Sequence, residues 1–192
     1  RYTFQAKEQI DESVISLLHW NNFSEELKNH FDKNKTVALD PKLHSIEEVN
    51  QIIELANKNE TKLHFTTPNL IDEFWIDKPE RKYSSIFDHR INYAGIEAKN
   101  KVDQFIKELR NNNLDSYFLS SLDSIAWLLN LRGGDILHTP LAFAYLFISV
   151  EYKPVLYVCI EKLNKDLKTR LNEFLTLEPI EKIDNIFNNL RK

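Results

Sequence analysis

The chain has 192 residues, of which 42% are hydrophobic and 28% are charged, a composition typical of a folded globular protein. This length is too great for a single minimal domain and suits one large domain or two small ones. The formal net charge of −4 gives no surplus of Lys and Arg, which argues against general attraction to nucleic acid or anionic lipid.

A single cysteine, Cys159, excludes an intrachain disulfide, so we expect a reducing, cytoplasmic compartment. No apolar stretch approaches the ~20 residues that a membrane span needs, so we expect no membrane partner.

Strand-like and helix-like segments alternate along the first half of the sequence. Ser45 and Glu48 form a capping box at the start of a predicted helix, with Ile53 and Ala56 on its apolar face. The predicted order is a strand at residues 1–6, a strand at 36–41 that ends at Pro41, a helix from 45 to 56, a strand at 63–67 and a short capped helix at 69–75.

The second half continues the alternation. Its predicted elements are an amphipathic helix over 98–110, a strand over 117–119, a helix over 121–131, two antiparallel strands over 141–151 and 155–160, and helices over 163–174 and 180–190.

This order predicts an α/β protein with mixed sheets flanked by helices. Residues 77–89 hold Pro79 and several charges but little periodic apolar content. We therefore predict a first domain over 1–78, a linker over 79–90 and a second domain over 91–192.

The most distinctive stretch is 121–135, which contains two of the three glycines. We expect Ser120 and Asp123 to cap its helix, with Trp127 packed beside the inward-facing Ile125, Leu128 and Leu129. Gly133 is predicted to end the helix with a positive φ.

Arg132 lies near the negative end of that helix, where a cation is favoured, and Asp135 is positioned to pair with it. A glycine-rich turn can also bind a phosphate. These glycines follow a helix instead of preceding one, so structural capping is favoured over phosphate binding.

Residues 122–135 resemble the aminopeptidase P family of Xaa-Pro aminopeptidases, in the creatinase/prolidase group. The family pattern Leu-Asp-x-Ile-Ala-Trp-Leu-x-Asn-Leu-Arg-Gly-Ser-Asp is matched from Leu122 to Asp135, except that Gly134 replaces serine. Further likeness lies in residues 1–6, 69–75, 77–79 and 93–95.

The resemblance implies two creatinase N-terminal-like domains, the first and possibly the second incomplete, without the pita-bread domain. That missing domain would hold two divalent metals, usually manganese, so we expect no metal site and no catalytic residue in this chain. Arg1 resembles an arginine that contacts substrate in the family, and Asp123, Trp127, Arg132, Gly133 and Asp135 form the family's structural motif.

Other candidate sites are weaker. The six histidines show no HExxH or HxH spacing, so a metal site is disfavoured. Ser120 and Ser121 lack a nucleophile elbow, and Cys159 lies in an apolar strand where burial raises a thiol pKa. The three tryptophans are expected in the core in preference to a ligand site.

The leading hypothesis is the non-catalytic N-terminal region of a Xaa-Pro aminopeptidase-like metallopeptidase, which shapes substrate access and supports a homodimer or binds its own catalytic domain. The substrate would be a peptide with proline second. The alternative is a free-standing α/β interaction or assembly module from a split or decayed gene.

Overall fold

The computed structural model describes residues 2–11, 13–18 and 27–189 and divides the chain into two compact units, unit 1 (Arg1–Pro79) and unit 2 (Glu80–Lys192). Each unit combines helices with a β-sheet, which confirms the predicted α/β class. Within the described ranges, none of the helices is both long and apolar enough to cross a membrane.

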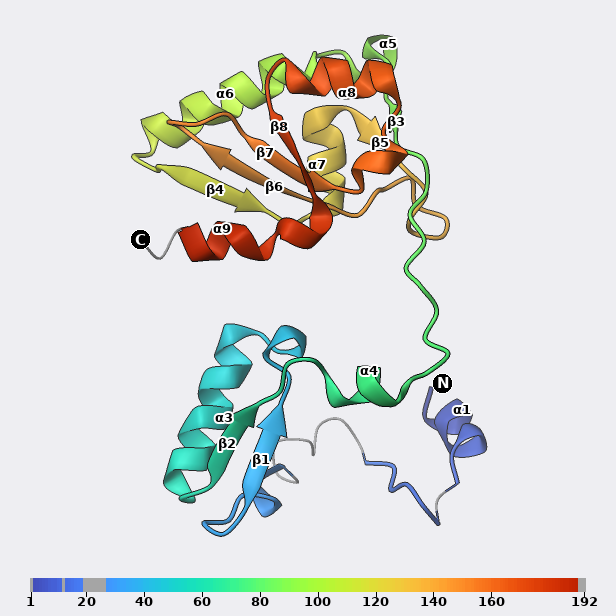
Figure 1. Cartoon of the computed structure of the whole chain (residues 1–192), viewed down its shortest axis with the longest axis vertical. Coiled ribbons are helices and arrows are strands. Elements are labelled where there is room, and N and C mark those ends of the chain that lie inside the picture. Colours follow the sequence, from blue (N-terminus) through green and yellow to red (C-terminus); the bar gives the residue numbers. More distant parts are fainter. Residues whose placement is uncertain (1, 12, 19–26, 190–192) are drawn as a thin grey trace. The chain divides into compact units, whose positions relative to one another are not determined.

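Unit 1 is built on a β-α-β crossover (Figure 1). β1 (Thr36–Leu39) and β2 (Lys62–Phe65) pair in parallel, and the 3-10 helix η2 (Pro41–Leu43) and α3 (Ile46–Lys58) connect them. Parallel neighbours require such a crossover, because a tight turn joins only antiparallel strands. Both strands and the helix were predicted and are confirmed.

Two N-caps in unit 1 agree with the sequence patterns. At α3 the Ser45 amide donates to Glu48 Oε2 at 2.7 Å, and the Glu48 amide donates to Ser45 Oγ at 3.2 Å, which completes the capping box. At α4 (Leu70–Phe74) the Ile71 amide donates to Asn69 Oδ1 at 2.8 Å. The short capped helix predicted here is therefore confirmed.

The strand predicted over residues 1–6 is wrong. Residues 2–9 form the helix α1 (Tyr2–Gln9), and none of its residues is buried. A helix satisfies its backbone hydrogen bonds internally, whereas a strand needs a neighbour, and the described part of unit 1 pairs only β1 with β2.

Unit 2 is organised around a four-stranded mixed sheet with the order β4-β6-β7-β8. The strands are β4 (Ser116–Leu119), β6 (Ala144–Ser149), β7 (Val155–Val158) and β8 (Thr176–Pro179). The first three run antiparallel in succession, which confirms the predicted hairpin, and β8 lies parallel to β7. β8 was not predicted, since its residues were assigned to no element.

Helices cover both faces of this sheet (Figure 1). α6 (Ala98–Asn111), α7 (Leu122–Leu129) and α8 (Lys165–Asn172) pack into the main core, and α9 (Asp184–Asn189) lies on the opposite side. Leu129, Leu146, Ile148, Leu156 and Leu171 are fully buried. The short elements are α5 (Ile91–Ala94), η3 (Ile160–Lys162) and η4 (Ile180–Lys182).

Residues 84–90, within the segment predicted as a linker, pack in unit 2. Ile86 is only 3% exposed, and its amide donates to the Lys162 carbonyl at 2.9 Å. β3 (Phe87–Asp88) then pairs antiparallel with β5 (Leu131–Arg132). This segment lacks helical or alternating periodicity because only two residues pair and one side chain enters the core.

Candidate functional site

The motif residues of unit 2 lie along α7 and in the segment that follows it. Asp123 lies in the first turn of α7 and Trp127 near its end, Arg132 lies in β5, and Gly133 and Asp135 follow. These residues are close in sequence, but they contact different parts of the unit.

Arg1, the predicted substrate contact, lies outside the residues that the structure describes, as do Trp20 and His19. The assignment of Arg1 therefore stays a prediction.

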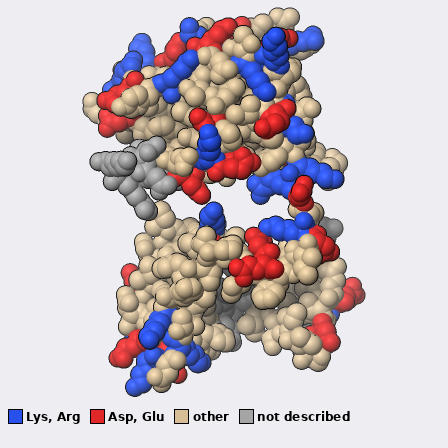
Figure 2. Space-filling model, viewed as in Figure 1, with Lys and Arg blue, Asp and Glu red and all other residues tan. Residues whose placement is uncertain are grey.

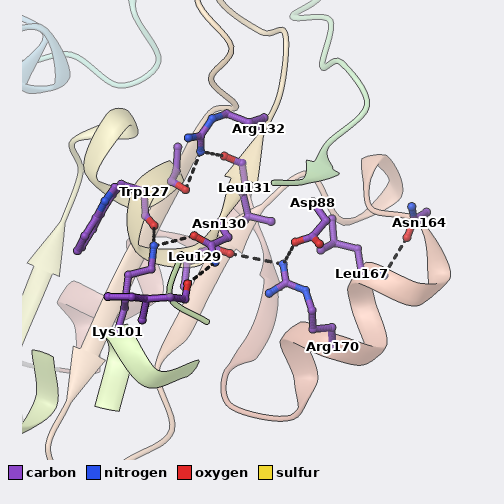
Figure 3. A network of polar contacts seen from close by, with 12 residues as sticks. Asp88, Lys101, Trp127, Leu129, Asn130, Leu131, Arg132, Asn164, Leu167 and Arg170 are labelled. Carbon is purple, nitrogen blue, oxygen red and sulfur yellow. Dashed lines mark hydrogen bonds and ion pairs between the residues drawn. The ribbon is translucent and has the colours of Figure 1, made fainter. Parts of the chain in front are cut away.

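Asn130 joins three segments of unit 2 (Figure 3). With φ 53° and ψ 44° it adopts the left-handed conformation that ends α7, a conformation that Asn tolerates better than most residues. Its Nδ2 donates to the Ile96 carbonyl at 2.9 Å, and its Oδ1 accepts from Lys101 Nζ at 2.6 Å. Its carbonyl accepts from the His89 amide at 2.7 Å. Asn130 thus ties α6, α7 and β3 together.

Lys101 is the charged member of this network. The residue is only 5% exposed, Nζ also donates to the Trp127 carbonyl, and Nζ lies 4.2 Å from the centroid of the Trp127 ring. Burial, and secondarily the charge of Arg132, lowers the pKa of Lys101. The signal in the sequence was a lysine on the apolar stripe of α6, one residue before the buried Val102.

Trp127 does not lie in the core as predicted. Its side chain is 61% exposed, whereas Ile125, Leu128 and Leu129 are buried as expected. Each helical residue is rotated by about 100° from the previous one, so Trp127 lies about 200° around α7 from the buried Ile125 and points outward. A cation–π contact with Lys101 supports the exposed ring.

Asp123 does not form the predicted capping box with Ser120. The N-cap of α7 is Ser121, and its side chain donates to Asp123 Oδ1 instead of capping a backbone amide. The Ser124 amide also donates to Oδ1, at 2.8 Å. These hydrogen bonds, first from Ser121 and then from Ser124, lower the pKa of Asp123.

Arg132 binds the end of α7, as the dipole argument predicted. Its Nη1 donates to the Ala126 carbonyl at 3.0 Å and to the Leu131 carbonyl at 2.7 Å (Figure 3). The predicted pair with Asp135 is wrong, because Asp135 accepts from the backbone amides of Ser84 and Phe143. Asp135 therefore fastens the turn after β5 to the segment that precedes β3.

Gly133 is needed for space and not for a positive φ, so the predicted helix-ending role is wrong. Among the described glycines only Gly95 has a positive φ, 76°. A Cβ on Gly133 would lie 2.7 Å from Ala142 Cβ and 3.1 Å from Ala142 Cα. Residue 142 approaches residue 133 so closely that no side chain fits at position 133.

Asp88 and Arg170 form an ion pair that the sequence did not reveal. Asp88 Oδ1 lies 2.7 Å from Arg170 Nη2, which also donates to the Leu129 carbonyl at 3.4 Å (Figure 3). Both residues line a polar cavity of about 320 Å³ together with Arg90, Glu97 and Asn130. The two partners are 82 positions apart in the chain, so neither periodicity nor local spacing could join them.

Metal-ligand side chains do not cluster in the part of the chain that the structure describes. No group of three or more His, Cys, Asp or Glu residues there is arranged to hold a metal ion. On the face drawn in Figure 2, basic and acidic side chains are interspersed without a continuous basic surface.

Cys159 is expected to alkylate slowly. Its thiol donates to Glu161 Oε2 at 3.4 Å, and burial, followed by this hydrogen bond and the negative charge of Glu161, raises the thiol pKa. Because the thiolate is the reactive form, iodoacetamide at pH 8 should modify the folded chain several-fold more slowly than the chain in urea, measured by mass spectrometry. Equal rates would contradict the predicted structural role.

Comparison with family models and curated proteins gives consistent matches. The model described as "Creatinase/Prolidase N-terminal domain" matches residues 77–192. A probable Xaa-Pro aminopeptidase P of Talaromyces marneffei is 32% identical over 95% of this chain, and Aminopeptidase P2 of Arabidopsis thaliana is 31% identical over 95%. The chain spans only 28% and 27% of the lengths of these two proteins.

A solved structure shares the fold. The X-prolyl aminopeptidase of Caenorhabditis elegans, described as a cytosolic enzyme with a di-nuclear active site, superposes with a TM-score of 0.82 at 22% identity. The match covers 98% of this chain and 32% of that protein.

Proposed function

The chain belongs to the Creatinase/Prolidase N-terminal domain family, and from this premise we propose that it is a non-catalytic scaffold of a Xaa-Pro aminopeptidase-like metallopeptidase. In this proposal its two units shape the access of a peptide whose second residue is proline. The observation that carries the proposal is the family match over 116 residues, supported by aminopeptidase P relatives that align with 95% of the chain.

The proposal assigns the chemistry to a domain outside these 192 residues. A pair of divalent metals, expected to be manganese, would there activate a water for attack on the Xaa-Pro carbonyl. The described residues do not fit such a pair, because they offer no cluster of carboxylate and imidazole ligands. No step of the reaction is therefore assigned to a residue of this chain.

We also propose that the protein works in the cytoplasm and that these units contribute to a dimer. The first part is supported by the cytosolic description of the C. elegans enzyme. Light scattering of the purified chain tests the second, since a monomer has a mass of 22.7 kDa and a dimer twice that value.

The alternative, a free-standing interaction module, is favoured by one specific observation. Trp127 and Tyr117 are 61% and 44% exposed and line the same groove, and exposed apolar side chains that lie together mark interaction sites. Pull-down with a separately produced pita-bread chain separates the two proposals. Capture of that chain supports a scaffold that binds its catalytic domain. A stable, folded chain that does not bind the pita-bread chain supports the free-standing module.

A peptidase assay tests the proposed lack of catalysis. The purified chain, given an Arg-Pro-Pro peptide and manganese, is expected to release no arginine above the buffer blank, measured by chromatography. Aminopeptidase P2 of Arabidopsis thaliana is the matched control, because it aligns over 95% of this chain and extends beyond it. Release by the 192-residue chain that needs manganese and stops with a chelator would contradict the proposal.

A further inference from the structure

An apolar groove lies between α6, β4 and α7 in unit 2. Its volume is about 560 Å³, within the range of about 300–1,000 Å³ in which protein pockets bind drug-sized groups. It is lined by Phe105, Tyr117, Leu119, Asp123, Ser124, Trp127 and Leu128. The space accommodates at least one large side chain of a partner.

Two of the exposed side chains that line this groove are aromatic. Trp127 is 61% exposed and Tyr117 is 44% exposed. Tyr117 packs edge-to-face on Phe105, with ring centroids 5.4 Å apart. Trp and Tyr carry a large share of the binding energy at protein interfaces, because each buries a large area. These two rings therefore offer apolar surface that a partner can cover.

The indole of Trp127 is held in place before any partner arrives. Lys101 Nζ lies 4.2 Å from the ring centroid, and the same Nζ donates to the Trp127 carbonyl and to Asn130 Oδ1. Burying an ammonium group costs solvation, and here the group fixes an exposed ring. A side chain that is already ordered loses little entropy on binding.

The lining of the groove carries one acidic side chain, and the Lys101 ammonium lies 4.2 Å from the centroid of the Trp127 ring. Asp123 is the one charged residue among those that line it, and its side chain is exposed. Both hydrogen bonds from Ser121 and Ser124 are accepted by Oδ1, so Oδ2 retains lone pairs for an incoming donor. An aspartate carboxylate is ionised at neutral pH, and the hydrogen bonds from Ser121 and Ser124 lower the pKa of Asp123 further. A cation beside an apolar group complements this arrangement.

We propose that the groove is a docking site for a segment of another protein that presents an aromatic or aliphatic side chain next to a Lys or Arg. The apolar side chain packs between Trp127 and Tyr117, and the basic group pairs with Asp123. This inference goes beyond the proposed scaffold function, because the groove is formed wholly by unit 2 and its binding requires no catalytic domain.

The test titrates two blocked dipeptides, acetyl-Phe-Arg-amide and acetyl-Phe-Glu-amide, into the ¹⁵N-labelled full chain and follows the indole N–H resonance of Trp127. We expect saturable shifts with millimolar affinity for the Arg peptide and about three-fold weaker binding of the Glu peptide. Asp123→Asn should remove this difference while leaving the Glu peptide's affinity unchanged or slightly higher.

Two further variants distinguish binding in the groove from non-specific binding of the peptide elsewhere on the chain. Tyr117→Ala should lower the affinity for the Arg peptide about ten-fold or more, because it removes one wall of the groove. Trp75→Ala is the matched control, because Trp75 is 47% exposed but lies in unit 1. This variant should leave the affinity for the Arg peptide unchanged. Both variants are compared only after circular dichroism shows the wild-type fold. If Tyr117→Ala does not fold, Tyr117→Ser takes its place.

Three results would overturn the proposal. One is equal affinity for the two peptides, and another is a Trp127 resonance that stays in place at saturating peptide. The third is a Trp127 shift that depends on protein concentration without peptide, together with a dimeric mass by light scattering, because the groove would then bind a second copy of this chain.

Discussion

Replacement of Lys101 by Met should lower the free energy of unfolding of unit 2 by about 2 kcal/mol, and replacement by Ala by about 3 kcal/mol. Met keeps the packing of the aliphatic stem but leaves Asn130 Oδ1 and the Trp127 carbonyl without their donor. Ala also removes the aliphatic stem, which is buried because the residue is only 5% exposed.

A competing effect makes this result informative. A buried ammonium is costly, and a well-packed apolar replacement of a buried charge is neutral or stabilising in some proteins. We expect the hydrogen bonds to outweigh this cost because two acceptors share one donor group and the ring of Trp127 provides a further contact.

The measurement is urea unfolding of the full chain, with the transition of unit 2 followed by hydrogen exchange of amides in α6. Lys99→Met is the matched control, since Lys99 is exposed on the same helix, and its effect should stay within about 0.5 kcal/mol. Equal stability of the Lys101→Met variant and the wild type would show that desolvation of the ammonium cancels its hydrogen bonds.

The stability difference between wild type and Lys101→Met is expected to depend on pH. Burial lowers the folded-state pKa of Lys101 below its ordinary value of 10.5, so the unfolded chain holds this proton more tightly. The contribution of Lys101 to stability is therefore fully present above pH 10.5 and decreases as the pH falls through the folded-state pKa. The stability difference between wild type and Lys101→Met, measured by urea unfolding, should widen as the pH rises from the folded-state pKa towards 10.5.

Elements with local signals were predictable from the sequence. The capping box of Ser45 and Glu48 and the 14-residue amphipathic α6 depend on residues within a few turns of each other. The β6-β7 hairpin was predictable because β-prone residues flank a turn that contains Pro154. In each case the stabilising contacts are short-range, so the pattern alone identifies the element.

Features that depend on distant residues were not predictable. α7 is eight residues long and mostly apolar, so its composition did not show that Trp127 would face outward. The contact that supports the ring comes from Lys101, 26 positions earlier. β8 is recognisable only through its parallel partner β7, and its sequence Thr-Leu-Glu-Pro carries a weak strand signal.

The role of Gly133 was misassigned for the same reason. A glycine shortly after a helix commonly ends it, but here Asn130 already takes the left-handed conformation. The neighbour that requires glycine is Ala142, nine positions further along the chain. Sequence motifs mark such a glycine without saying which property of it is used.

Gly133→Ala should therefore lower the free energy of unfolding of unit 2 by about 2 kcal/mol. The added Cβ would lie 2.7 Å from Ala142 Cβ and 3.1 Å from the backbone nitrogen of Ala142, and neither atom belongs to a flexible side chain end. The two segments, 133–135 and 140–142, cannot separate without breaking hydrogen bonds, because the Gly133 amide donates to the Pro140 carbonyl at 3.2 Å and the Asp135 amide to the Leu141 carbonyl at 2.9 Å.

The neighbouring glycine supplies the control for this prediction. A Cβ on Gly134 would first meet Ser84 Oγ at 3.3 Å, and that hydroxyl can rotate away, so Gly134→Ala should change stability by less than about 0.5 kcal/mol. Ala142→Gly in the Gly133→Ala background should recover part of the loss, because it removes the 2.7 Å contact but keeps the two at 3.1 Å. Equal effects of the two glycine substitutions in urea unfolding would show that the close approach to Ala142 does not explain Gly133.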